Sequence, residues 1–135
     1  MSLQFKTSLR DGWLDLVESS IGTTPIMTIR TGSAPATCAT ANSGTVLATL
    51  NLPSDWMAAS SSGSKAKSGT WNDTSADNTG TAAHFRIHDS GGTNCFIQGT
   101  VTATGGGGDL TLDSVSITAT QTITITSFTL SAPGA

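Results

Sequence analysis

The chain has 135 residues and a formal net charge of −3, and only 11% of its residues are charged. This length suits one domain with one hydrophobic core, so we expect a single domain over residues 1–135. The sequence has no cluster of Lys and Arg and no apolar run long enough to span a bilayer. Nucleic acid and membranes are therefore not expected partners.

The composition favours a β domain. Ser and Thr fill 42 positions, Gly fills 15, and Tyr is absent. Thr, Ile and Val recur in alternating runs, whereas a disordered chain usually combines high charge with few β-branched residues. We therefore expect a folded, Thr-rich protein whose turns are marked by glycine.

The one predicted helix covers residues 8–21. Ser8 and Asp11 have the spacing of a capping box, and Gly22 stands where a left-handed residue often ends a helix. Apolar residues at helical spacing predict the face that packs against a sheet. They are Leu9, Trp13, Leu16 and Val17. We interpret Trp13 as a packing residue rather than as a platform for a ligand.

The rest of the chain predicts strands, which form a β core over residues 26–131. Apolar or alternating runs are found at 26–31, 45–52, 69–71, 82–89, 94–104, 110–117 and 121–130. Turn signals recur roughly every 8–12 residues, which is typical of an antiparallel β-sandwich or barrel. We expect about seven strands.

Two features interrupt the predicted strands. The alternation changes parity after Asp113 and again near Ser127, which predicts a bulge or bend at each place. Residues 58–68 have no clear period and are rich in Ser. We expect them to form an exposed, flexible excursion that carries Lys65 and Lys67.

The two cysteines, Cys38 and Cys95, are too far apart in the sequence for a CxxC metal or redox motif. They could close one disulfide across a long loop, or stay free. Residues 1–13 lack the basic and apolar regions of a secretory signal, so we expect free thiols that fill small apolar spaces.

His84 and His88 are the obvious candidates for metal ligands. Because the run 82–89 alternates, both lie on a strand, where four residues span roughly 13 Å. One zinc ion, with zinc–nitrogen bonds of about 2.1 Å, does not bridge that distance. We therefore expect solvent-facing or interface histidines, on the same side of the strand as Arg86, and no metal site.

The carboxylates Asp73, Asp77 and Asp89 stand in or beside predicted turns. The stretch 73–84 fails as an EF-hand loop, because Asn78 takes the position that requires Gly. An irregular calcium site at Asp73 and Asp77 stays open as an alternative. Turn capping is the interpretation we favour.

The four glycines at 105–108 lack the Lys and the strand–loop–helix context of a phosphate-binding loop. We interpret them as a hinge or as a loop that lets chain segments approach closely. The sequence holds no GxSxG and no HExxH motif, and few aromatic residues are available for a sugar platform. We expect no catalytic activity and no cofactor.

The surface chemistry favours assembly. Ser and Thr side chains lose little conformational entropy at a contact, whereas each ordered Lys or Glu costs about 0.5–1.5 kcal/mol. The terminal segments MSLQFKT and SAPGA read as short arms, so they are candidate contact segments as well as candidate frayed ends.

Several segments together resemble a group of small proteins encoded among the structural genes of tailed bacteriophages and prophages. These segments are, in chain order, LRDGWLDLVESSIG, IMTIRTGSAPA, LATLNLP, WNDTSADNTGTAAHFRIHD, IQGTV, GGGGDLTLD and QTITITSFTLSAPGA. The resemblance covers nearly the whole chain and includes no catalytic signature, so it transfers no functional residue.

The resemblance implies a structural virion protein, in the first place a capsid decoration or cement protein. Its partner would be the major capsid protein, and its own copies would associate, with a trimer as the expected form. Assembly would take place in the cytoplasm of the host bacterium, which agrees with free thiols. The alternative is a tail or head-fibre module that binds glycans of the host surface.

Overall fold

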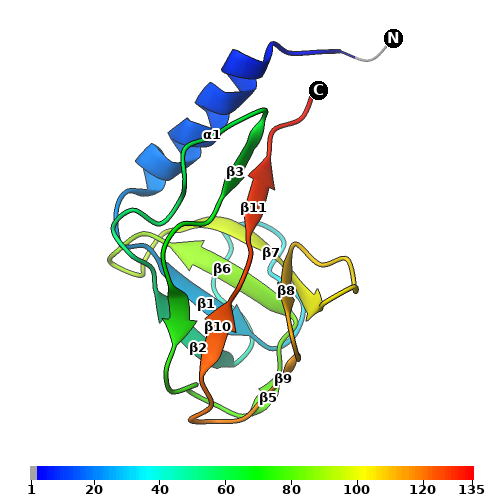
Figure 1. The fold of residues 1–135 in the computed structure, drawn as a ribbon. Coiled ribbons are helices and arrows are strands. Elements are labelled where there is room, and N and C mark those ends of the chain that lie inside the picture. The colour runs from blue at the N-terminus through cyan, green and yellow to red at the C-terminus, as the bar shows by residue number, and fades with distance from the viewer. Residues whose placement is uncertain (1–2) are drawn as a thin grey trace.

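A computed structural model describes residues 3–135 and shows a mainly β protein with one helix and a curled, antiparallel-rich sheet (Figure 1). The elements are α1 (Thr7–Ile21), β1 (Ile26–Arg30), β2 (Val46–Asn51), β3 (Ser64–Ala66), β4 (Trp71–Asp73), β5 (Gly80–Thr81), β6 (His84–His88), β7 (Cys95–Ala103), β8 (Leu110–Leu112), β9 (Ser116–Ile117), β10 (Ile123–Ile125) and β11 (Thr129–Ser131). The helix lies at one end of the molecule, beside β3 and β11.

The main sheet has five strands in the order β2-β1-β6-β7-β8. Adjacent strands of this sheet are antiparallel, except for β7 and β8, which are parallel. Three further pairs, β10-β4, β11-β3 and β5-β9, are also antiparallel. The predicted hairpin between 82–89 and 94–104 is confirmed as β6 and β7.

The predicted parity changes fall where the chain leaves one partner strand for another. After Asp113 the chain passes from β8, which pairs with β7, to β9, which pairs with β5. Near Ser127 it passes from β10, which pairs with β4, to β11, which pairs with β3. Two runs that the sequence analysis treats as single strands are thereby each divided.

The glycines at 105–108 make a short parallel connection feasible. Parallel neighbours usually need a crossover of about a dozen residues or more, yet only residues 104–109 join β7 to β8. Gly105 and Gly107 have φ values of 88° and 79°. A Cβ on Gly108 would lie 2.8 Å from Oγ1 of Thr102, so the chain approaches this side chain closely. The interpretation as a loop of close approach is confirmed.

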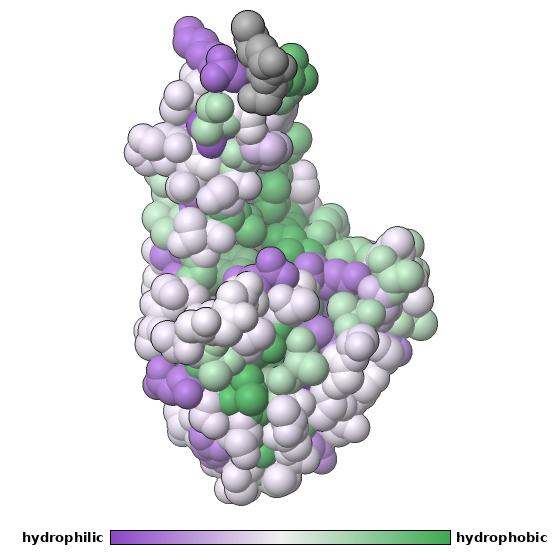
Figure 2. All heavy atoms as spheres, turned by 90° about the vertical axis from the view of Figure 1, so that its right-hand side faces the viewer, coloured by the Kyte–Doolittle hydropathy of each residue, from purple (hydrophilic) through white to green (hydrophobic). Residues whose placement is uncertain are grey.

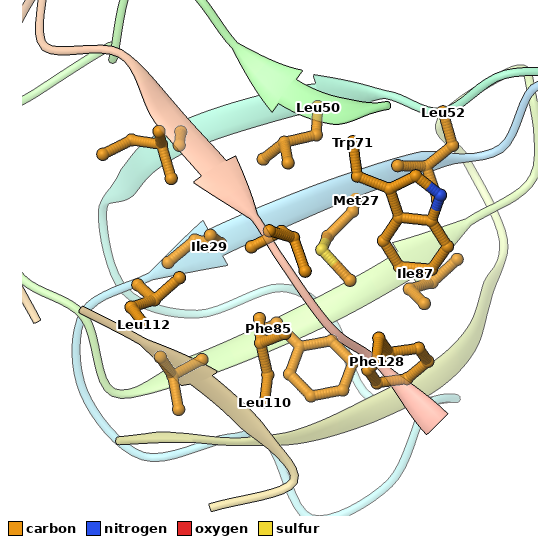
Figure 3. Close-up of a cluster of buried hydrophobic side chains, with 14 of the residues drawn as sticks. Met27, Ile29, Leu50, Leu52, Trp71, Phe85, Ile87, Leu110, Leu112 and Phe128 are labelled. Atoms are coloured by element: carbon orange, nitrogen blue, oxygen red, sulfur yellow. The ribbon is translucent and has the colours of Figure 1, made fainter. Parts of the chain in front are cut away.

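One hydrophobic core lies under the sheet (Figure 3). Strands β1, β2 and β6 contribute its aliphatic part, which includes Met27, Ile29, Leu50 and Ile87. Four aromatic rings run through it in series, with centroid separations of 6.0, 5.5 and 5.6 Å. They are Trp56, Trp71, Phe128 and Phe85. Trp71 lies in β4, Phe128 directly precedes β11, and Phe85 lies in β6. The series therefore joins the pairs β10-β4 and β11-β3 to the main sheet in one core.

The predicted helix is confirmed, but its predicted capping box is wrong, and its predicted packing face is right only for Val17, which packs against the core. Lys6 occupies the N-cap without a side-chain hydrogen bond, so Ser8 and Asp11 do not form a capping box. Gly22 does end the helix, with a φ of 88°. The buried helical residues are Leu14 and Ile21 rather than the predicted stripe.

The helix docks through Leu14, Ile21 and partly Val17, together with three acidic side chains. Asp11, Asp15 and Glu18 recur at i, i+4 and i+7 and face the hairpin that contains β3. The Lys65 ammonium, 2% exposed, lies 2.8 Å from Asp15 Oδ1 and 2.7 Å from Glu18 Oε2. The amide of Gly63 donates to Asp11 Oδ1 at 2.7 Å. The prediction of a flexible excursion that exposes Lys65 is therefore wrong.

The described parts of both terminal arms lie against each other. The amide of Phe5 donates to the Gly134 carbonyl at 2.8 Å, and Arg10 Nη2 donates to the Ala132 carbonyl at 2.8 Å. The ring of Phe5 packs edge-on against Trp13, with centroids 4.8 Å apart. Met1 and Ser2, which belong to the predicted N-terminal arm, lie outside the described residues.

Candidate functional site

The polar side of β6 is buried, which overturns the prediction of solvent-facing histidines. His84, Arg86 and His88 are 0%, 1% and 2% exposed. Arg30 of the adjacent strand is buried as well. The connection between β1 and β2, residues 31–45, lies over this side of the sheet, as its hydrogen bonds to Arg86 and His84 show.

Arg86 is stabilised by neutral groups. Its Nη1 donates to Asn42 Oδ1 at 2.6 Å, and its Nη2 donates to the carbonyls of Cys38 and Thr40 at 2.9 and 3.0 Å. Across residues 3–135, only Lys65 forms an ion pair, so the buried guanidinium has no carboxylate partner. These contacts make Arg86 the residue that holds the covering loop in place.

The buried positive charge acts on its neighbours. Burial and the charge of Arg86 lower the pKa of Arg30. Burial, followed by the charges of Arg86 and Arg30, lowers the pKa of His88. The His88 side chain is therefore a neutral imidazole near pH 7, consistent with its place among two guanidinium groups.

The two histidines are not brought together. His84 Nδ1 bonds with the Gly32 carbonyl at 2.6 Å, and His88 Nε2 bonds with Asn42 Oδ1 at 3.3 Å. Within the described part of the chain, no three His, Cys, Asp or Glu side chains are grouped closely enough to hold a metal ion.

Two of the three predicted turn carboxylates cap turns: Asp73 Oδ1 accepts from the Ser75 amide at 3.0 Å and Asp89 Oδ1 accepts from the Thr93 amide at 3.1 Å. The prediction is wrong for Asp77, whose carboxylate bonds with Thr49 of β2 instead. Asp73 Oδ2 accepts from the Thr49 amide at 2.9 Å, and Asp77 Oδ2 accepts from the Thr49 hydroxyl at 2.8 Å. Asp89 accepts from Asn94 Nδ2 at 2.8 Å and from the Thr93 amide, and these bonds lower its pKa. Asp73 and Asp77 thus share Thr49 as a partner, whereas Asp89 bonds within the turn between β6 and β7.

Both cysteines border a polar pocket of about 390 Å³ beneath the covering loop. Arg86, His88, Asn42 and Asn94 also line it. The two thiols are free and partly exposed, and their sulfur atoms lie 2.8 Å apart. Free thiols are what the sequence analysis predicts, but they contact each other instead of filling separate apolar spaces.

The exposed face of α1 is apolar. Leu9, Trp13 and Leu16 are 47%, 37% and 61% exposed, and Phe96 of β7 is 43% exposed beside them. A groove of about 230 Å³ lies between helix and sheet, lined by Trp13, Leu16, Val17, Ser20, Ile21 and Phe96. Figure 2 shows apolar surface gathered in the notch where the upper part of the molecule meets the lower body.

We name the four exposed side chains Leu9, Trp13, Leu16 and Phe96 the apolar helix face. Large apolar side chains that are contiguous on a surface are typical of protein-binding sites, whereas isolated ones need no explanation. Among residues 3–135, no helix is long and apolar enough to cross a membrane. The apolar helix face is therefore the candidate functional site.

Comparison with known proteins finds no matching family model, no matching curated protein and no matching solved structure. The described residues define the class of fold, a mainly β protein with one docked helix.

Proposed function

We propose that this protein is a structural component of a tailed-phage virion, namely a decoration protein that binds the major capsid protein and stabilises the head. The observation that carries the proposal is the apolar helix face, which leaves Leu16 61% exposed in a chain with few charged residues. The proposal assigns no catalytic activity, metal or cofactor to the chain.

The face is presented on a fixed element, which supports binding. The ion pairs of the buried Lys65 side chain with Asp15 and Glu18 hold α1 from the opposite side. A helix that is already ordered loses little conformational entropy when it binds a partner. Its apolar side chains can therefore contribute most of their burial energy to the contact.

Attachment to a lattice multiplies a modest contact. Each copy would bury a small apolar area, and a closed cluster of copies, such as a trimer, would match the symmetry axes of a head. Linked contacts then sum to a large total affinity. We propose that the curled sheet and the three strand pairs act as one rigid β-sandwich or barrel that carries the helix.

The proposal is tested with heads of the parent phage from which this gene has been deleted. The purified protein is mixed with these heads, and bound protein is measured after sedimentation. We expect wild type to bind at roughly hundreds of copies per head, as a lattice requires. Leu16→Asp should lose at least tenfold in binding, because it places a charge in the apolar contact.

The matched control is Ser8→Asp, which adds the same charge to an exposed position of the same helix. It should bind like wild type, and both variants should show the thermal unfolding of wild type. Failure of wild type to bind heads would overturn the proposal. Recovery of only a few copies per virion, in tail fractions, would favour the glycan-binding tail module instead.

A further inference from the structure

The two thiols come from segments that are distant in the sequence. Cys38 lies in the connection between β1 and β2, and Cys95 is the first residue of β7, 57 positions later. Their sulfur atoms are 2.8 Å apart, whereas a disulfide bond measures about 2.05 Å. The sulfurs need to approach by less than about 1 Å to bond.

The contact is held in place without a covalent bond. Arg86 donates to the carbonyl of Cys38 itself and to that of Thr40, so the segment that carries Cys38 is fixed over the sheet. Cys95 is fixed by its place in β7, where it pairs with His88. Both thiols border the open polar pocket, so a small oxidant can reach them.

We propose that Cys38 and Cys95 are a site of reversible oxidation, at which a small organic disulfide such as oxidised glutathione converts the two thiols into one intramolecular disulfide. One cysteine thiolate attacks the oxidant, which releases one glutathione thiol and leaves a mixed disulfide. The second cysteine then attacks the protein sulfur and releases the second glutathione thiol. The oxidant takes up both electrons, and the two thiol protons end on the released glutathione molecules.

The geometry assigns the order of attack. Cys95 Sγ has two acceptors in reach, Cys38 Sγ at 2.8 Å and the Ile97 carbonyl oxygen at 3.4 Å, and a hydrogen bond to either one favours the protonated thiol. Burial and the contact with Cys38 raise the pKa of Cys95 to about 11, and the nearby charge of Arg86 offsets this only in part. Cys95 therefore serves as the second, resolving thiol.

The bond would fasten the covering loop to the main sheet. It would close a loop across 57 positions, and long closures restrict the unfolded chain most. The loop covers His84, Arg86 and His88, so oxidation would also hinder exposure of these buried groups.

The experiment uses the full chain, first reduced and then equilibrated in glutathione buffers of increasing oxidised fraction. Intact mass and thiol alkylation measure the disulfide, and non-reducing gels separate monomers from linked dimers. We expect a monomer that has lost two hydrogen atoms and both free thiols, and dithiothreitol should restore them. The melting temperature should rise by roughly 10 °C on oxidation.

Cys38→Ser and Cys95→Ser are the matched controls, since each removes one sulfur with little change of volume. Each should keep the melting temperature of the reduced wild type and should show no rise in oxidising buffer. Persistence of both free thiols in fully oxidised glutathione, or oxidation only to linked dimers, would overturn the proposal. This test uses isolated protein, so its outcome is independent of the head-binding test.

Discussion

The ion pairs that help to dock α1 join one buried cation to two more exposed carboxylates. Lys65 is 2% exposed, whereas Asp15 and Glu18 are 57% and 25% exposed. Burial alone would lower the pKa of Lys65, but its hydrogen bonds to the two carboxylates outweigh burial and raise it. The double variant Asp15→Asn/Glu18→Gln removes both carboxylate charges and leaves the ammonium without an anionic partner.

Neutralising the two carboxylates should lower the free energy of unfolding more than neutralising Lys65. Breaking a buried pair by removing one side costs about 3–5 kcal/mol. We expect a smaller loss, about 2 kcal/mol, for the double variant, because the exposed Asp15 carboxylate is screened by water and because the helix can move away and admit water to Lys65. Lys65→Met keeps most of the side-chain volume and leaves carboxylates that water can solvate, so it should cost about 1 kcal/mol or less.

Urea unfolding of the three proteins, followed by circular dichroism, gives the free energies of unfolding by linear extrapolation. Hydrogen exchange of the α1 amides shows whether the helix leaves before the sheet unfolds. Equal losses in the double variant and in Lys65→Met would refute the reasoning, because burial would then not decide the cost. A double variant within about 0.5 kcal/mol of wild type would refute it as well.

Three further perturbations test other parts of the structure. Trp71→Ala, in the centre of the aromatic series, should lower the free energy of unfolding by about 3–5 kcal/mol in urea. Trp13→Ala should cost only about 1 kcal/mol, since it loses an edge-on contact with Phe5 at a half-exposed site, and a loss above 3 kcal/mol would contradict this. The pKa of His88 is lowered from its ordinary 6.5, so the unfolded chain binds more protons; stability should be full above pH 6.5 and fall below it. His88→Gln should flatten this pH dependence in thermal unfolding, and an unchanged slope would contradict it.

Local patterns predict the elements well because they depend on neighbours in the sequence. The helix is confirmed within one residue, and the hairpin of β6 and β7 follows from alternation and a glycine turn. Partner strands are less predictable, because β9 and β11 are chosen by segments more than 30 positions away. Parity changes reveal where a strand ends, but they do not reveal which strand comes next.

The outward face of α1 is mispredicted because the partner of the helix, like the partner strands, lies far away in the sequence. An apolar stripe on a helix predicts burial only if no stronger partner exists for another face. Asp11, Asp15 and Glu18 form a second stripe, which docks by bonding to Lys65 and to the Gly63 amide beside the buried Leu14 and Ile21. The acids at i, i+4 and i+7 can be recognised in the sequence as a second helix face. Their partner, the hairpin that contains Lys65, is identified only in the folded structure.

Buried charge and exposed apolar surface are linked in this fold. Of the six Lys and Arg residues, Arg30, Lys65 and Arg86 are buried. Lys65 bonds to α1 and Arg86 bonds to the covering loop, whereas Arg30 bonds to Thr28 of its own strand. Because the buried Lys65 binds the carboxylates of α1, the helix stays attached while Leu9, Trp13 and Leu16 face outward. A protein selected only for stability would gain by the opposite orientation, since burial of such side chains contributes about 25 cal/mol per Å². The outward orientation therefore supports the proposed contact with a capsid protein.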